Sequence, residues 1–154
     1  EDVVARVVSV ASVGHRHGTL DFDDLGFERG GYAIMKAYGR SKLANVLFAS
    51  ELARQLAGTG VTSNSLHPGG VATNIWSGAP LWAKPFITLA WPFFISARQG
   101  ASYIVALATR PDLQQVSGAY FERGKQVLPS PAARDEALAR RLWDVSSRLT
   151  NVAG

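Results

Sequence analysis

The chain has 154 residues, of which 47% are hydrophobic and 18% charged, a composition typical of one globular domain with a single core. Its formal charge of +4 is spread without a run of lysines and arginines that could follow a phosphate backbone, which argues against a nucleic-acid partner. The absence of cysteine excludes disulfides, zinc thiolates and cysteine nucleophiles, and it fits a reducing compartment such as the cytoplasm. Any catalysis must therefore use oxygen and nitrogen groups.

The first predicted element is a buried strand over residues 6–12, a β-branched run that ends in small residues. Residues 15–31 are polar and glycine-rich, which indicates an irregular, partly ordered segment. The alanine-rich pattern over 33–57 predicts a long helix with Gly58 placed to end it. A second strand is predicted over 61–66, and a strand, a helix and a strand in this order make a βαβ unit in a parallel sheet.

The second half of the chain continues the alternation. An aromatic stretch over 76–96 is followed by a predicted helix over 97–109, a third strand within 116–121 and a returning segment over 126–128. For the last helix, Ser130 is the expected N-cap and Pro131 the first residue, with an apolar stripe formed by Leu138, Leu142, Val145 and Leu149. Neither an internal repeat nor a linker is visible, so residues 1–154 are interpreted as one domain.

A tyrosine and a lysine four residues apart, Tyr38 and Lys42, carry the clearest chemistry. One helical turn separates them, so the phenol and the ammonium share a helix face, and an ammonium favours the ionised form of a nearby phenol. Ser12 ends the preceding strand, so all three should meet at the carboxyl edge of a parallel sheet, where open α/β folds bind ligands. Taken singly, each residue also fits a purely structural role. Tyr38 and Lys42 could be a surface pair on a helix, and Ser12 could cap a turn.

Six blocks in order resemble the short-chain dehydrogenase/reductase family, and within it the retinol-dehydrogenase-like members. The blocks span residues 6–12, 21–25, 38–48, 64–69, 117–121 and 129–135. The resemblance covers nearly the whole chain and implies an α/β fold, the C-terminal half of a Rossmann-like doubly wound parallel sheet with flanking helices.

The resemblance also implies a reaction. In that family a tyrosine exchanges a proton with the substrate oxygen while hydride passes between the nicotinamide and the carbinol carbon, the role that falls here on Tyr38. The family's lysine favours the ionised tyrosine and binds the nicotinamide ribose, and its serine orients the substrate oxygen, roles that fall on Lys42 and Ser12. The implied cofactor is NADP or NAD, with NADP favoured, and the implied substrate is a small apolar alcohol or carbonyl compound.

The turn after the second predicted strand is a candidate cofactor contact. The family uses a proline-glycine turn and a later threonine to hold the nicotinamide end, and Pro68, Gly69 and Thr73 fit those places. Proline lacks an N–H and glycine allows close backbone approach, so a flat ring could meet the main chain here. An ordinary tight turn, with Thr73 capping a helix, is the alternative.

Two further segments admit several interpretations. The aromatic residues 76–96 could close over an apolar substrate, contact a membrane surface from one side or pack in a core or oligomer interface, whereas three prolines argue against a spanning helix. His15 and His17 with Asp21, Asp23 and Asp24 could form a hard-metal site, but the aspartates fall in a family block without a metal role, so no metal is expected.

The family's first strand, glycine-rich turn and helix, which bind the cofactor pyrophosphate, have no counterpart in this sequence. The chain is therefore interpreted as a partial domain, the catalytic half, whose first strand has an unpaired edge, and the isolated chain is expected to bind NADPH or NADH poorly. Two functions stay open: half of an NAD(P)-dependent oxidoreductase, or a truncated, catalytically silent remnant acting through protein association. The protein is also expected to form a homo-oligomer. Its expected location is the cytoplasm, with a peripheral membrane contact as the alternative.

Overall fold

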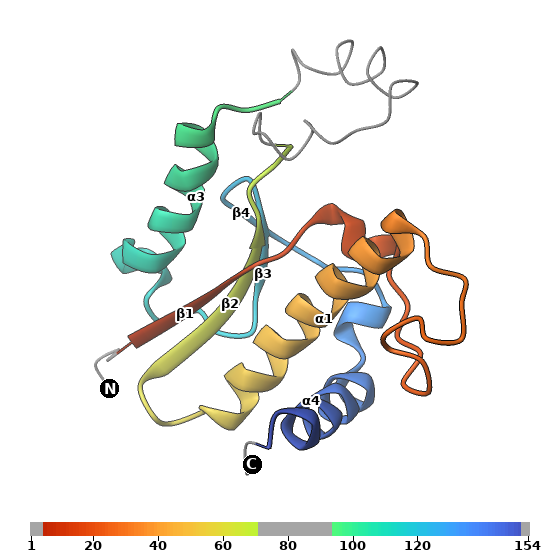
Figure 1. The fold of residues 1–154 in the computed structure, drawn as a ribbon. Helices are drawn as coiled ribbons and strands as arrows, with labels where there is room; N and C mark the ends of the chain where they lie inside the picture. Colours follow the sequence, from red (N-terminus) through yellow and green to blue (C-terminus); the bar gives the residue numbers. More distant parts are fainter. Residues whose placement is uncertain (1–4, 71–93, 152–154) are drawn as a thin grey trace.

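The computed structural model describes residues 5–70 and 94–151. Four strands form one sheet in the order β1-β2-β3-β4 (Figure 1). They are β1 (Ala5–Val10), β2 (Val61–His67), β3 (Tyr120–Glu122) and β4 (Lys125–Val127). The first three are parallel and β4 is antiparallel to β3, so the predicted α/β architecture with a largely parallel sheet is confirmed.

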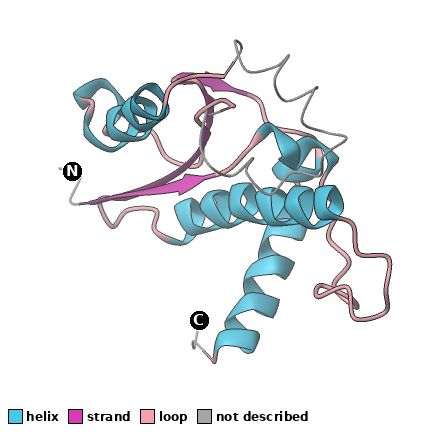
Figure 2. Cartoon of the chain, turned by 45° about the horizontal axis from the view of Figure 1, so that its top comes forward, coloured by secondary structure: helices cyan, strands magenta, loops and turns pink. Residues whose placement is uncertain are grey.

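Helices cover both faces of the sheet and give three layers. Helix α1 (Ile34–Gln55) and helix α4 (Glu136–Thr150) pack on one face, and helix α3 (Ala97–Thr109) packs on the other (Figures 1 and 2). Neighbouring side chains of β3 divide between the two cores: Tyr120 packs with α1 and α4, and Phe121 packs with α3. Both residues are almost fully buried, so this short strand links the two layers of apolar contact.

Helix α1 is the long helix predicted over 33–57, but it stops at Gln55. The backbone turns at Leu56, whose N–H donates to the carbonyl oxygens of Leu52 and Arg54, and Gly58 follows in the left-handed region at φ +80°. The buried face of α1 includes Leu43, Val46 and Leu47, which lie three and four residues apart as on one side of a helix.

The third strand, predicted within 116–121, is the short β3, which begins only at Tyr120 and ends at Glu122. A buried side chain of β2 binds the segment just before it. Asn64, buried in β2, donates through Nδ2 to the carbonyl oxygen of Val116 at 2.6 Å and accepts from the N–H of Ala119 at 2.9 Å. The Gly118 N–H, at φ +76°, donates to the carbonyl oxygen of Ser63 at 2.7 Å, and the regular register with β2 follows from Tyr120 opposite Ser65. The returning segment predicted over 126–128 is β4, joined to β3 by a two-residue turn with Arg123 at φ +48° and Gly124 at φ +79°.

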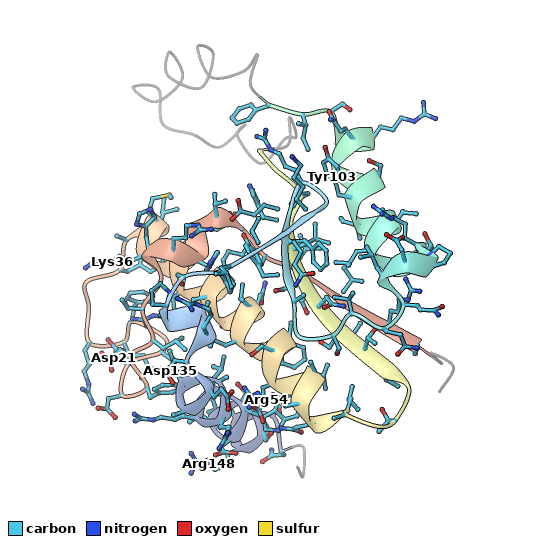
Figure 3. The ribbon with its side chains drawn as sticks, turned by 180° about the vertical axis from the view of Figure 1, so that it is seen from behind. Asp21, Lys36, Arg54, Tyr103, Asp135 and Arg148 are labelled. Atoms are coloured by element: carbon cyan, nitrogen blue, oxygen red, sulfur yellow. The ribbon has the colours of Figure 1, made fainter. Side chains whose placement is uncertain are left out.

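The predicted start of the last helix is wrong. Ser130 caps a separate 3-10 turn, Ala132–Arg134, by accepting from the N–H of Ala133 at 3.3 Å, and α4 begins only after Asp135. The Asp135 carboxylate accepts from the N–H of Leu138 at 3.0 Å, as an N-cap does, and Figure 3 shows it at the start of the helix. Of the predicted apolar stripe, Leu142 is buried, whereas Leu149 is 71% exposed near the helix end.

The polar segment between β1 and α1 contains a short 3-10 helix, Val13–His17, that the sequence does not predict. We refer to it as the serine turn, because Ser12 is its N-cap. The loop that follows projects beside the start of α1 (Figures 1 and 2). Arg40 on α1 anchors this loop: its guanidinium donates to the carbonyl oxygens of Thr19, Asp24 and Leu25 and lies 3.9 Å from the centroid of the Phe27 ring.

Strand β1 lies at one end of the described sheet and pairs only with β2 among the described strands. Within residues 5–70 and 94–151, the helices are too short or too polar to cross a bilayer.

Candidate active site

The carboxyl ends of β1 and β2 bring together the segments that the sequence selects. In the parallel register Val10 pairs with Leu66, so Ser12 and Pro68 each follow two residues after paired positions on neighbouring strands. The pairing continues beyond β1, because the N–H of Ala11 donates to the carbonyl oxygen of Leu66 at 2.7 Å. The candidate catalytic serine and the candidate cofactor turn therefore share one edge of the sheet, as the βαβ reasoning predicts.

Ser12 is fixed by the start of the serine turn. Its Oγ accepts a hydrogen bond from the N–H of Gly14 at 3.1 Å, and its carbonyl oxygen accepts from the N–H of His15 at 3.0 Å. The residue is 6% exposed. Ser12 therefore does cap the turn. Its hydroxyl accepts one hydrogen bond and still has its own proton to donate. The cap fixes where that donor lies.

Tyr38 and Lys42 lie on successive turns of α1 near its N-terminal end. The Lys42 Nζ is 5.6 Å from the centroid of the Tyr38 ring, within the range of a cation–π contact. Tyr38 is 36% exposed, so the ring is supported on one side and open to a ligand on the other. The predicted sharing of one helix face by phenol and ammonium is therefore present in the structure.

Gly14 is the point at which the serine and the tyrosine meet. A Cβ atom placed on Gly14 would lie 2.8 Å from Cε1 of Tyr38 and 3.6 Å from Oγ of Ser12. The Tyr38 ring therefore packs directly over the backbone of Gly14, and the Ser12 hydroxyl lies close to the same point. Any side chain at this position would push the ring away.

Two more glycines allow the serine turn to reach α1. A Cβ atom on Gly18 would come within 2.3 Å of the carbonyl oxygen of Gly39, and one on Gly39 would lie 3.1 Å from the carbonyl oxygen of Gly14. The backbone of the turn thus rests directly on the backbone of the helix, one residue from Tyr38. Glycine inside a helix costs about 1 kcal/mol relative to alanine, so Gly39 was a signal of close packing that could be read from the sequence.

Asn45 is a further site residue that the sequence reasoning missed. One turn beyond Lys42, its Nδ2 donates to the carbonyl oxygen of Val10 at 3.0 Å. This bond ties α1 to the end of β1, two residues before Ser12. It fixes the distance between the helix that carries the tyrosine and the strand that carries the serine.

The proline-glycine turn follows β2 directly. Gly69 is buried at φ +112°, and a Cβ atom there would lie 3.0 Å from Cδ1 of Ile95 and 3.2 Å from Nε of Arg123. The carbonyl oxygen of Gly70 accepts from the N–H of Ile95 at 2.8 Å. The left-handed backbone and the crowding both require glycine at position 69. Thr73 and residues 76–93 lie outside the described residues, so the predicted threonine contact and aromatic lid stay predictions.

Charged groups surround this edge. Arg16 of the serine turn forms an ion pair with Glu122 of β3, with Nη2 2.9 Å from Oε1. Burial alone would raise the pKa of Glu122, but the hydrogen bond and the charge of Arg16 hold that pKa below its usual range. His67, paired in register with Glu122, has a pKa lowered by burial, against the opposing effect of that carboxylate. The ion pair joins the serine turn to the central strands.

The candidate metal ligands are not arranged as a cluster. Among residues 5–70 and 94–151, no group of three or more histidine, aspartate or glutamate side chains could hold a metal ion. His15 and His17 lie in a 3-10 turn, not in the extended segment that would align them, and His15 is buried whereas His17 is exposed. Asp21 and Asp24 instead accept hydrogen bonds from backbone N–H groups of their own loop.

Two histidines with lowered pKa values predict a pH-dependent stability. Burial lowers the pKa of both His15 and His67 below the usual value of about 6.5, so the unfolded chain takes up protons first as the pH falls. The contribution of these neutral histidines to the free energy of unfolding is fully present above about pH 6.5 and decreases below it. Urea unfolding across this window should show stability falling on acidification, less steeply in His15→Asn and unchanged in slope in the exposed His17→Gln. A stability that stays constant or rises between pH 7 and pH 5 would contradict this assignment.

Comparison with known proteins agrees with this geometry. A family model described as short chain dehydrogenase matches residues 27–83. Retinol dehydrogenase 14 of Mus musculus is 44% identical over 151 residues, covering 96% of this chain and 45% of that protein. A crystal structure of an uncharacterized protein from Mycobacterium paratuberculosis matches with a TM-score of 0.70 at 29% identity, over 95% of this chain and 50% of that one.

A blue fluorescent protein from a metagenomic library, solved with NADPH, shares the fold with a TM-score of 0.56 at 24% identity, over 79% of this chain and 44% of that chain. The chain belongs to the short-chain dehydrogenase/reductase family, and its relatives are retinol-dehydrogenase-like. It spans about half the length of the relatives that it matches.

Proposed function

We propose that this chain carries the catalytic half of an NAD(P)-dependent oxidoreductase that interconverts an apolar alcohol and its carbonyl compound. One observation carries the proposal: the Ser12 hydroxyl and the Tyr38 ring both lie within 4 Å of the place of a Cβ atom on Gly14, at the carboxyl edge of the sheet, with the Lys42 ammonium 5.6 Å from the ring centroid. A hydroxyl donor, a phenol and an ammonium in one place are the groups needed to bind a carbonyl oxygen and move a proton to it.

Each residue has a distinct role in this proposal. Tyr38 donates its phenolic proton to the substrate oxygen during reduction and takes it back during oxidation, and Lys42 holds its ammonium 5.6 Å from the centroid of the Tyr38 ring. Ser12 donates a hydrogen bond to the same substrate oxygen and orients it. A bound nicotinamide would supply or accept the hydride. The proline-glycine turn after the strand next to Ser12 supports this placement of the nicotinamide, because Gly69 there has φ +112°, a backbone conformation that favours glycine.

The surroundings of Tyr38 favour an apolar substrate. Ile34 and Met35, one turn before Tyr38 on α1, are 73% and 72% exposed, and Val13 of the serine turn is 41% exposed. Apolar side chains this exposed beside a reactive phenol would gain by covering an apolar ligand. The similar mouse protein is named for retinol, an apolar alcohol. We further propose a cytoplasmic homo-oligomer, in keeping with the cysteine-free sequence.

The test uses the full-length protein, with whatever precedes and follows this chain. With NADPH or NADH and a series of apolar aldehydes, we expect carbonyl-dependent oxidation of the nicotinamide. Lys42→Ala should raise the dissociation constant of the nicotinamide nucleotide and lower turnover. Lys36→Ala, an exposed lysine on the same helix (Figure 3), should leave both unchanged. No nicotinamide oxidation with any aldehyde or ketone of the series would overturn the proposal.

A second candidate function rests on the edge position of β1. A strand paired on one side only is a template for another chain, so a catalytically silent remnant could act through association. The gene sequence upstream of the codon for Glu1 separates the two functions. A strand followed by a glycine-rich turn supports the oxidoreductase, and a start codon at that place supports the remnant.

A further inference from the structure

His15 is a buried polar side chain that the proposed chemistry leaves unused. It lies in the serine turn with 0% exposure. Its Nδ1 is 2.7 Å from the carbonyl oxygen of Ser12, and its Nε2 is 3.1 Å from the backbone nitrogen of Ser130. A backbone N–H can only donate and a carbonyl can only accept. The partners therefore assign the tautomer: Nδ1 carries the proton and donates to Ser12, and Nε2 accepts from Ser130.

The imidazole links two distant parts of the chain at the site. The carbonyl oxygen of Ser12 receives two donors, the ring Nδ1–H and the backbone N–H of His15. At the other end, buried Ser130 holds the turn before α4, because its Oγ accepts from the N–H of Ala133. The Tyr120 ring packs edge-on against the imidazole with centroids 4.8 Å apart, which fixes the plane of the ring.

We propose that His15 is a positioning residue for Ser12, whose neutral imidazole, donating to the Ser12 carbonyl and accepting from the Ser130 N–H, holds the Ser12 hydroxyl beside Gly14 and Tyr38. The inference rests on the proposed function, in which Ser12 orients the substrate oxygen. His15, which does not touch the substrate, thus has the task of holding Ser12, which does.

The charges around His15 bear on which form of the imidazole the site can hold. Tyr120 and Glu122 face it from β3, His67 lies on β2, and Arg16 follows it in the serine turn. Burial lowers the pKa of His15 and Arg16 lowers it further, whereas the bond to Ser12 and the charge of Glu122 raise it. A proton on Nε2 would face the Ser130 N–H donor to donor, so protonation removes one of the two bonds.

Matched substitutions separate the two bonds. His15→Asn keeps an amide donor near the place of Nδ1, whereas His15→Gln extends an amide toward the place of Nε2 and leaves the Ser12 carbonyl without the ring donor. In the full-length protein we expect kcat to fall by about three- to tenfold in His15→Gln, as for one lost hydrogen bond, and by less in His15→Asn. Cofactor affinity should stay unchanged in both. His17→Gln, an exposed histidine of the same turn, should match the unaltered protein.

Nuclear magnetic resonance of the full-length protein with isotope-labelled histidine provides a readout independent of activity. We expect a protonated Nδ1, an unprotonated Nε2 and a hydrogen-bond coupling from the Ser130 amide to Nε2. An Nε2-protonated tautomer, or an equal loss of kcat in the Asn and Gln variants, would overturn the inference and leave the proposed function intact. If the expected spectrum were found without any oxidoreductase activity, the proposed function itself would fail. The role of His15 in catalysis would then fail with it.

Discussion

Tyr38→Phe should lower turnover of an apolar aldehyde by about a hundredfold to ten-thousandfold, the range typical for removal of a general acid. The substitution deletes one oxygen and keeps the ring, whose edge packs on Gly14. The serine turn and α1 should therefore keep their positions, and nucleotide affinity should change little. Steady-state kinetics of the full-length protein, with a nucleotide-binding titration, measure the two quantities separately.

Tyr32→Phe is the matched control for this prediction. Tyr32 precedes the same helix, is 65% exposed and contacts the Phe27 ring of the neighbouring loop. Loss of its hydroxyl should leave turnover unchanged. If Tyr38→Phe kept near-normal turnover, the assignment of Tyr38 as the proton donor would fail.

Gly18→Ala should damage both the fold and the site. The added Cβ would come within 2.3 Å of the Gly39 carbonyl oxygen and 2.8 Å of the Leu43 Cβ, and backbone cannot yield as a flexible side chain does. We expect a loss of about 1–3 kcal/mol in the free energy of unfolding. Because the serine turn must move away from α1, turnover should fall as well. Urea unfolding and steady-state kinetics measure both effects.

Gly26→Ala separates steric crowding from a general effect of replacing glycine in this loop. A Cβ atom on Gly26 would meet the side chain of Glu28, whose Cγ would be nearest at 3.5 Å, an ordinary contact. This variant should lose less than about 0.5 kcal/mol, as surface substitutions do. Equal stability of the two alanine variants would show that the turn does not rest on the helix as described.

The sequence predicts the parts of the site that depend on local spacing. Tyr38 and Lys42 share a helix face because four residues make about one turn, and Ser12 reaches the same edge because it follows a parallel strand. These rules need no knowledge of distant contacts. The α/β architecture and the parallel pairing of the first two strands follow from the same local patterns.

The parts that the sequence did not predict depend on contacts between distant segments. His15 stands in a polar stretch that resembles a solvated loop, and its burial depends on Ser130, 115 positions later in the chain. The contacts just before β3 depend on Asn64, whose side chain binds Val116 and Ala119, 52 and 55 positions away. The start of α4 was misplaced because Ser130 and Asp135 both satisfy the local rule for an N-cap, and each caps a different helix.

The proposed proton-transfer site is built on close backbone contact. Glycines at 14, 18 and 39 bring the serine turn onto α1, Asn45 ties that helix to β1, and His15 holds Ser12 from behind. The reactive groups lie on two elements of secondary structure, but their relative position is set by these short-range contacts. Substitutions that leave every catalytic group in place can consequently lower turnover.

The most direct test of the central claim follows hydride from cofactor to product. The full-length protein is incubated with nicotinamide nucleotide deuterated at its reactive carbon and with an apolar aldehyde, and the alcohol is analysed by mass spectrometry. We predict one deuterium on the carbinol carbon of the product, formed by the unaltered protein and greatly reduced in Tyr38→Phe. Alcohol formed without deuterium, or in equal yield by the Tyr38→Phe variant, would contradict a hydride-transfer site that depends on this tyrosine.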